Sequence, residues 1–86
     1  MYTCKTVAEL KTKMRAALVL DEDAIAYAIG NYRCSDGRLV FLSRDTRIEH
    51  IGRVYVTVEG DDGDEIKIKP DPDERDLFGT EFTIDV

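Results

Sequence analysis

The spacing of the apolar residues changes along the chain, and this change constrains the fold more than any other feature. Between Val7 and Leu18 apolar side chains recur every three or four residues, which is the spacing of one helical face. After Gly37 they recur every second residue over several short runs, which is the spacing of strands. A helical segment followed by strands predicts an α+β domain, with helices packed on one face of a sheet.

The first helix has a start signal in the sequence. Thr6 and Glu9 have the spacing of a capping box, in which the threonine hydroxyl accepts a hydrogen bond from the Glu9 backbone amide. In the same motif the Glu9 side chain reaches back toward the Thr6 amide. We therefore expect a helix over about Val7–Leu18.

Residues 21–34 have two interpretations. The three consecutive carboxylates at 21–23 suit a helix N-terminus, where they meet free amides and the positive end of the helix dipole. This favours a second helix at about Glu22–Ile29, with Gly30 as its stop. The alternative makes Ala26–Cys34 a strand, followed by a tight Asp-Gly turn at residues 36–37. A short helix followed by a strand at 31–34 would combine the two.

The remaining residues form short apolar runs separated by turns. Leu39–Ser43 is expected to form a well-buried strand, and residues 44–51 fit either a loop or a ragged strand. Val54–Glu59 and Ile66–Lys69 alternate on either side of a Gly- and Asp-rich turn, which predicts a hairpin. The prolines at 70 and 72 interrupt the pattern, Leu77 and Phe78 anchor a loop, and Phe82–Val86 alternates as a last strand.

The expected fold is therefore two N-terminal helices packed on a mostly antiparallel sheet of four to five strands. An alternative closes the strands into a small SH3-like or Sm-like barrel with an N-terminal helix. The 86 residues are enough for one domain, 1–86.

The cysteine content and the short apolar runs indicate a cytoplasmic protein. Cys4 and Cys34 are too few for a disulfide framework, so we expect both to be reduced and partly buried, with a single bridge as the less favoured alternative. No apolar run approaches the ~20 residues of a spanning helix. The first residues also lack the pattern of a signal peptide.

Sequence motifs for catalysis or cofactor binding are weak. His50 is the only histidine, so any Ser–His or Cys–His nucleophile pair must use it. There is no Gly-rich phosphate loop and no dinucleotide fingerprint. The Asp-rich runs at 61–65 and 71–76 do not match the EF-hand spacing, and soft-metal ligands are too few. We expect no catalysis, no cofactor and no bound metal.

Acidic residues are concentrated in the last third of the chain. The whole chain has 18 acidic and 12 basic residues and a net charge of −6. Residues 1–58 hold 7 acidic and 9 basic residues, whereas residues 59–86 hold 11 acidic and 3 basic residues. We predict a partner-binding acidic face made of Asp61, Asp62, Asp64, Asp71, Asp73, Glu74 and Asp76.

Two local features would hold carboxylates in a fixed array. The prolines at 70 and 72 keep Asp71 and Asp73 in an extended path, about 6 Å apart at ~3.1 Å per residue. Glu81 and Asp85 share one face of the last strand, on either side of Thr83. Such an array presents charges like those of a nucleic-acid backbone, and it would steer a basic partner electrostatically.

We therefore predict a small non-catalytic interaction protein that binds a basic site on a macromolecular partner. By analogy of size and charge alone, it would act as nucleic-acid mimics do, for example phage-encoded inhibitors of bacterial defence nucleases.

Two alternatives remain. One is a small barrel that binds RNA or DNA through a local basic patch. The other is a structural or accessory subunit bound through an apolar patch. The residues of the basic patch would be Arg33, Arg38, Arg44, Arg47 and Arg53, with Tyr32 and Tyr55.

Overall fold

One helix and six strands form along the described chain, which comprises residues 2–60, 63–70 and 81–85 of this computed structural model. In chain order they are β1 (Tyr2–Cys4), α1 (Val7–Leu20), β2 (Ile25–Cys34), β3 (Leu39–Ile51), β4 (Val56–Glu59), β5 (Glu65–Pro70) and β6 (Glu81–Asp85). The helix in these ranges is too short and too polar to cross a membrane.

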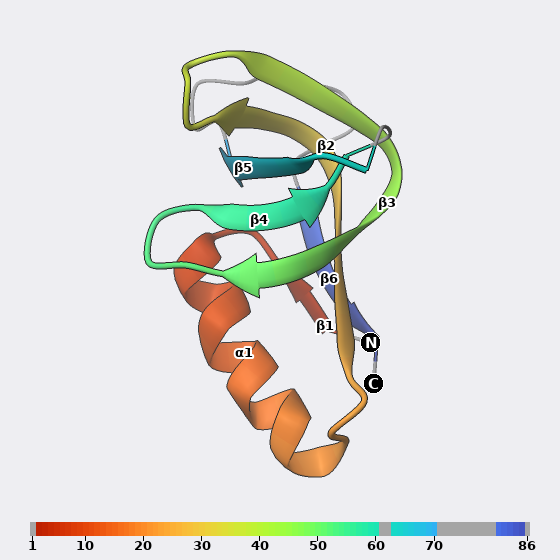
Figure 1. Ribbon diagram of the computed structural model, residues 1–86. Coiled ribbons are helices and arrows are strands. Elements are labelled where there is room, and N and C mark those ends of the chain that lie inside the picture. The colour runs from red at the N-terminus through yellow and green to blue at the C-terminus, as the bar shows by residue number, and fades with distance from the viewer. Residues whose placement is uncertain (1, 61–62, 71–80, 86) are drawn as a thin grey trace.

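Helix α1 begins where the sequence predicts. The Glu9 backbone amide donates to the Thr6 hydroxyl at 3.1 Å, which confirms the first half of the capping box. Val7, Leu10 and Ala17 are buried on the face that the apolar spacing marks. The helix packs against β1, β6 and β3, and it therefore covers one side of the sheet (Figure 1).

The predicted second helix, Glu22–Ile29, is wrong. Asp21 ends α1 instead, because its backbone amide donates to the Ala17 carbonyl at 2.8 Å. The Asp21 carboxylate then accepts from the Asp23 amide at 3.0 Å, which fixes a turn rather than a helix start. The chain continues directly into β2, so the alternative strand Ala26–Cys34 is confirmed.

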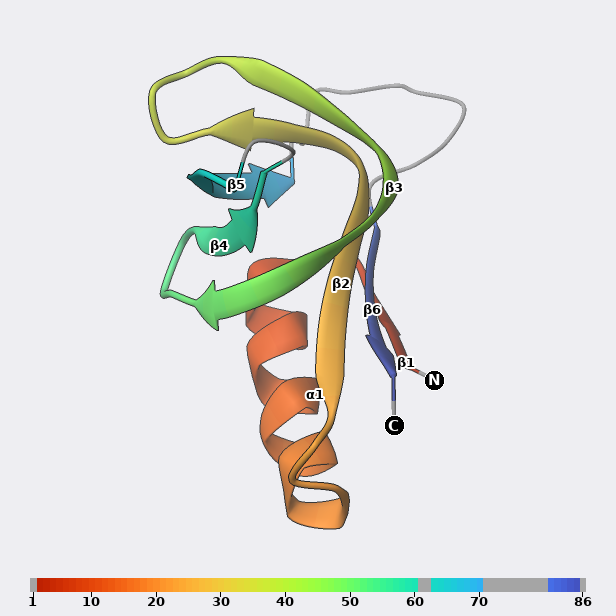
Figure 2. The ribbon, with the colours of Figure 1, turned by 45° about the vertical axis from the view of Figure 1, so that its right-hand side comes forward.

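Strand β2 organises the sheet because it pairs with three other strands. Its first half, Ile25–Ile29, pairs with β6, and its last three residues pair with β5. Along its other edge it pairs with β3. Since β3 also pairs with β4, and β4 with β5, the strands β2-β3-β4-β5 close on themselves. The fold is thus α+β, with one helix on a sheet that closes into a small barrel, and every observed pairing is antiparallel (Figures 1 and 2).

The corner of the barrel lies in the middle of β2 and β3, where both strands bend strongly (Figure 2). Ala28 pairs with Thr46 and Gly30 pairs with Leu42, so three residues of β3 oppose the single residue between them on β2. A bulge of this kind bends a strand and increases its twist. Gly30 has a φ of 114°, a conformation that side chains rarely adopt. The bulge and this glycine together let β2 pass from one part of the sheet to the other.

The core lies between α1 and the inner surface of the barrel. Tyr32 and Phe82 are its largest fully buried side chains, with ring centroids 5.3 Å apart. The Tyr32 hydroxyl lies 2.6 Å from the Glu81 carbonyl and 3.0 Å from the Ile29 carbonyl, so its one proton has two acceptors within reach. Burial raises the pKa of Tyr32 above its usual range.

Three details of the strands differ from expectation. The described residues form six strands rather than four to five. The run Leu39–Ser43 is not well buried, because it is the first part of β3 and exposes Leu39 by 57% and Phe41 by 49%. Val54 is 51% exposed and precedes β4, which begins at Val56. The hairpin of β4 and β5, the ragged strand at 44–51 and the inward Phe82 and Ile84 are confirmed.

Candidate functional site

The outer surface of β4 and β5 carries a row of polar side chains from three strands. In the sheet register His50 of β3 faces Thr57 of β4, and Thr57 faces Lys67 of β5. Directly opposed residues project to the same side of a sheet, so these three side chains share the outer surface. His50 and Lys67 are exposed, whereas Thr57 between them is only 9% exposed.

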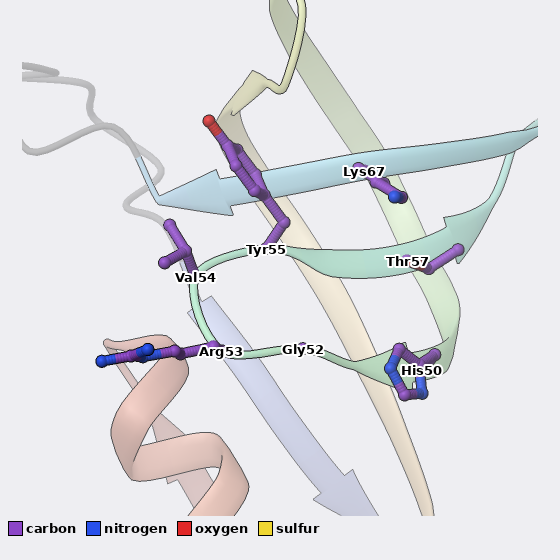
Figure 3. A pocket seen from close by; sticks show the side chains of 7 residues that line it. All are labelled: His50, Gly52, Arg53, Val54, Tyr55, Thr57 and Lys67. Carbon is purple, nitrogen blue, oxygen red and sulfur yellow. The ribbon is translucent and has the colours of Figure 1, made fainter.

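This row borders a shallow depression of about 400 Å³ (Figure 3). The turn between β3 and β4 supplies its other wall, with Arg53 and Val54 exposed and Tyr55 half-buried. None of the seven described residues along the wall is acidic. The depression therefore combines an aromatic ring with side chains that carry or can carry positive charge.

The turn holds its shape through a close backbone contact at Gly52. The Gly52 amide donates to the Tyr55 carbonyl at 2.8 Å. A Cβ atom at position 52 would lie 2.7 Å from the same carbonyl oxygen, which is closer than real Cβ contacts. A glycine is thus needed here for space, and it allows Arg53 and Tyr55 to flank the depression.

The positive charge continues from β5 onto β2. Lys69 Nζ lies 5.5 Å from the centroid of the Tyr55 ring, in a cation–π contact. Lys69 also faces Arg33 of β2 in the sheet register, so two cations lie side by side. The Arg33 guanidinium donates to the Gly37 carbonyl at 3.0 Å. We call this surface the basic–aromatic face; it consists of Arg33, His50, Arg53, Tyr55, Lys67 and Lys69.

The opposite end of the same hairpin is acidic. Glu59 of β4 faces Glu65 of β5, and both are exposed. Asp64 is exposed beside them, and its carbonyl accepts from the Gly60 amide at 2.7 Å. We call these three residues the acidic end. The hairpin therefore changes from negative to positive along its length.

Most of the predicted acidic face lies outside the described residues. Asp64 is the one member that the structure places, and it is exposed at the acidic end. On β6, Glu81 and Asp85 do lie on the same side as Thr83, opposite the buried Phe82 and Ile84. The residues outside the described part are Asp61, Asp62, Asp71, Asp73, Glu74 and Asp76, as are the loop residues Leu77 and Phe78.

The predicted arginine patch is brought together only in part. Arg33, Arg53 and Tyr55 belong to the basic–aromatic face. Tyr32 was expected on the same surface, and this expectation is wrong because Tyr32 is fully buried in the core. Arg47 lies elsewhere on the sheet, facing Tyr27 of β2, and the Arg44 side chain lies outside the described part.

Arg38 interacts within its own turn and does not belong to the basic–aromatic face. Its Nε donates to the Asp36 carboxylate at 2.8 Å, and its backbone amide donates to the same carboxylate at 3.0 Å. The amide hydrogen bond is the main cause that lowers the pKa of Asp36. Arg38 is thus engaged within the turn between β2 and β3.

Sequence reasoning missed Lys67 and Lys69 as functional candidates. The sequence predicts that both alternate with Ile66 and Ile68 on one strand of a hairpin, and it gives them no functional role. The sequence signal that could have identified them is their spacing, because residues two apart lie on the same side of a strand. The strand expected to pair with theirs follows directly after Tyr55.

The cysteines do not contribute a nucleophile to this surface. Cys4 and Cys34 are free, as expected, but they are buried rather than only partly buried, and burial raises the pKa of both thiols. A raised pKa disfavours the reactive thiolate. Across residues 2–60, 63–70 and 81–85, no three His, Cys, Asp or Glu side chains are grouped closely enough to hold a metal ion.

Comparison of the chain with protein-family models, with curated proteins and with solved structures gives no significant match. Any function must therefore be argued from the surface itself.

Proposed function

We propose that this chain is a small non-catalytic binding domain that holds nucleic acid against its basic–aromatic face. The observation that carries the proposal is a depression lined by Arg53, Tyr55 and Lys67, with Lys69 in a cation–π contact with the Tyr55 ring. Lysine and arginine contacts to phosphates supply most of the affinity of nucleic-acid binding, and aromatic rings provide surfaces for bases.

The pairing of Lys69 with Arg33 supports an anionic ligand. Lys69 and Arg33 face each other directly across two strands, so both side chains can reach one anion. A phosphate beside them would accept a charge-assisted hydrogen bond from each.

The acidic end restricts where on the hairpin nucleic acid can bind. Glu59, Asp64 and Glu65 repel phosphates, whereas Arg53, Lys67 and Lys69 attract them. The net charge of −6 also weakens non-specific attraction to nucleic acid, so that binding depends on the local patch. We further propose that the barrel is of the SH3-like or Sm-like kind, with its ligand on the outer surface of the hairpin.

The proposal predicts how one lysine affects binding. Lys67→Gln should weaken the binding of labelled RNA and DNA oligonucleotides without regard to sequence, because the lysine contacts phosphate. The slope of the logarithm of the binding constant against the logarithm of salt concentration should become shallower by about 0.7–1. Fluorescence anisotropy at several salt concentrations measures both effects.

Lys5→Gln is the matched control, because Lys5 is exposed in the turn between β1 and α1. It should leave the salt slope unchanged. If Lys5→Gln and Lys67→Gln change the slope equally, the basic–aromatic face has no special role.

A second candidate function rests on the acidic end. Glu59 and Glu65 face each other across the hairpin, and this like-charge pair is kept despite its cost. A basic protein partner could bind there and to the predicted acidic face. A partner captured by the wild type, lost on Glu59→Lys/Glu65→Lys and retained by Lys67→Gln would support this function over nucleic-acid binding.

A further inference from the structure

We infer that the basic–aromatic face accepts single-stranded rather than duplex nucleic acid, with one unpaired base stacked on Tyr55. This inference rests on the proposed function and names its ligand class. Three properties of the surface carry it: the position of Tyr55, the size of the depression and the arrangement of the cations.

Tyr55 is placed as a platform for a base. Its backbone is held by the hydrogen bond from the Gly52 amide at 2.8 Å, and its ring is half-buried beside the depression. A base can stack on an aromatic side chain only when its own face is uncovered. In a duplex both faces of an internal base are covered by its neighbours, so such a platform favours an unpaired strand.

The contact of Lys69 with the Tyr55 ring does not block stacking. A cation–π contact at an exposed site is weaker than the stacking of a base on an aromatic ring. A base can therefore displace the ammonium group, which lies 5.5 Å from the ring centroid in the free protein. The displaced Lys69 is then available to a phosphate next to the stacked base.

The depression and the elements around it are unsuited to a duplex. Its volume of about 400 Å³ is within the range of small-molecule sites, about 300–1,000 Å³. Reading a duplex in its major groove uses a helix or a two-stranded ribbon that enters the groove. The β4–β5 hairpin is not a free ribbon, because β4 also pairs with β3 and β5 also pairs with β2. The one described helix, α1, packs against β1, β6 and β3, and its Lys13 donates to the Thr3 carbonyl at 3.0 Å. The depression thus has room for a small ligand group rather than for a length of duplex.

The cations lie along a path that a single strand could follow. Lys67 and Lys69 are two residues apart on one side of β5, a separation of about 6.6 Å along an extended strand. Arg53 lies on the turn at the other wall of the depression, and its side chain extends away from His50 and Lys67 (Figure 3). A flexible strand can bend so that successive phosphates reach these groups while the intervening base stacks on Tyr55.

The test compares labelled 12-nucleotide poly-U and poly-dT strands with a hairpin duplex of similar length, by fluorescence anisotropy at one low salt concentration. The wild type should bind the single strands at least about fivefold more tightly than the duplex. Tyr55→Ala should weaken single-strand binding by roughly 5- to 100-fold and change duplex binding little, whereas Tyr55→Phe should retain it.

Tyr2→Ala is the control, because Tyr2 is exposed on β1 and outside the basic–aromatic face. It should leave single-strand binding unchanged. Equal wild-type affinity for strand and duplex, or an equal effect of Tyr55→Ala on both, overturns the single-strand inference and leaves nucleic-acid binding intact. Binding of neither ligand by the wild type overturns the proposed function as well. The wild-type and Tyr55→Phe comparisons decide the matter even if Tyr55→Ala fails to fold.

Discussion

Phe82→Ala is expected to lower the free energy of unfolding by about 3–5 kcal/mol, which is the usual loss when a buried phenylalanine is removed from a core. Phe82 is fully buried on β6, and its ring lies 5.3 Å from that of Tyr32. In the sheet register it faces both Cys4 of β1 and Ala28 of β2. These neighbours belong to two paired strands, β1 and β2, which cannot easily collapse into the cavity.

The loss would be a large part of the total stability of this domain. Domains are stabilised by roughly 0.05–0.15 kcal/mol per residue, which gives about 4–13 kcal/mol for a chain of this length. Urea denaturation followed by circular dichroism measures the change. Thr83→Ala, the outward neighbour on β6, is the control and should change stability by less than about 0.5 kcal/mol. A loss below about 1 kcal/mol for Phe82→Ala would show that β6 does not complete the core.

The double charge reversal Lys67→Glu/Lys69→Glu is expected to reduce nucleic-acid affinity by more than about 100-fold. Two attractive contacts are lost and two carboxylates are placed against phosphates, and like charges brought together at an interface cost several kcal/mol. The barrel should remain folded, because both side chains are on the outer surface and a glutamate at position 69 would face Arg33.

The matched control is Lys5→Glu/Lys11→Glu, which changes the net charge by the same amount in the turn before α1 and on α1 itself. It should weaken binding only slightly at moderate salt, since distant exposed charges are screened beyond roughly 10 Å. If both double variants lose affinity equally, the overall charge of the chain governs binding, and the basic–aromatic face does not.

The sequence predicts α1 well because several independent signals agree there. The capping box and the apolar face indicate the same start, and the observed helix extends two residues beyond the predicted end. The hairpin of β4 and β5 is equally well marked, because Ile66 and Ile68 alternate with lysines after a glycine-rich turn.

Strand β2 is harder to predict because its apolar pattern is inverted. The residues that face the core include Ala26 and Ala28, which are small, whereas Ile25, Tyr27 and Ile29 are half-exposed on the outer surface. The large apolar side chains therefore lie on the outer side of the strand, and their spacing predicts the wrong side as the one that faces the core. Alanines are also good helix formers, so local propensity favours a helix where tertiary pairing with β3 and β6 produces a strand.

The candidate site shows a related limit. Acidic residues dominate the composition of the last third of the chain. The few basic residues that the fold brings together, Arg53, Lys67 and Lys69, do not stand out from this composition. Arg53 and Lys67 are far apart in sequence, and only the closing of β3, β4 and β5 around one depression makes them neighbours. Tyr32 shows the reverse case: its spacing near two arginines suggests a surface ring, whereas the inward side of β2 buries it.

The most direct test of the account is an NMR titration of the ¹⁵N-labelled chain with a single-stranded oligonucleotide. The largest amide shift changes are expected in residues 50–57 and 67–69, and those of the acidic end should be much smaller. Shift changes centred on α1 or on the acidic end, or the absence of any change at low salt, would contradict the assignment of the basic–aromatic face as a nucleic-acid-binding surface.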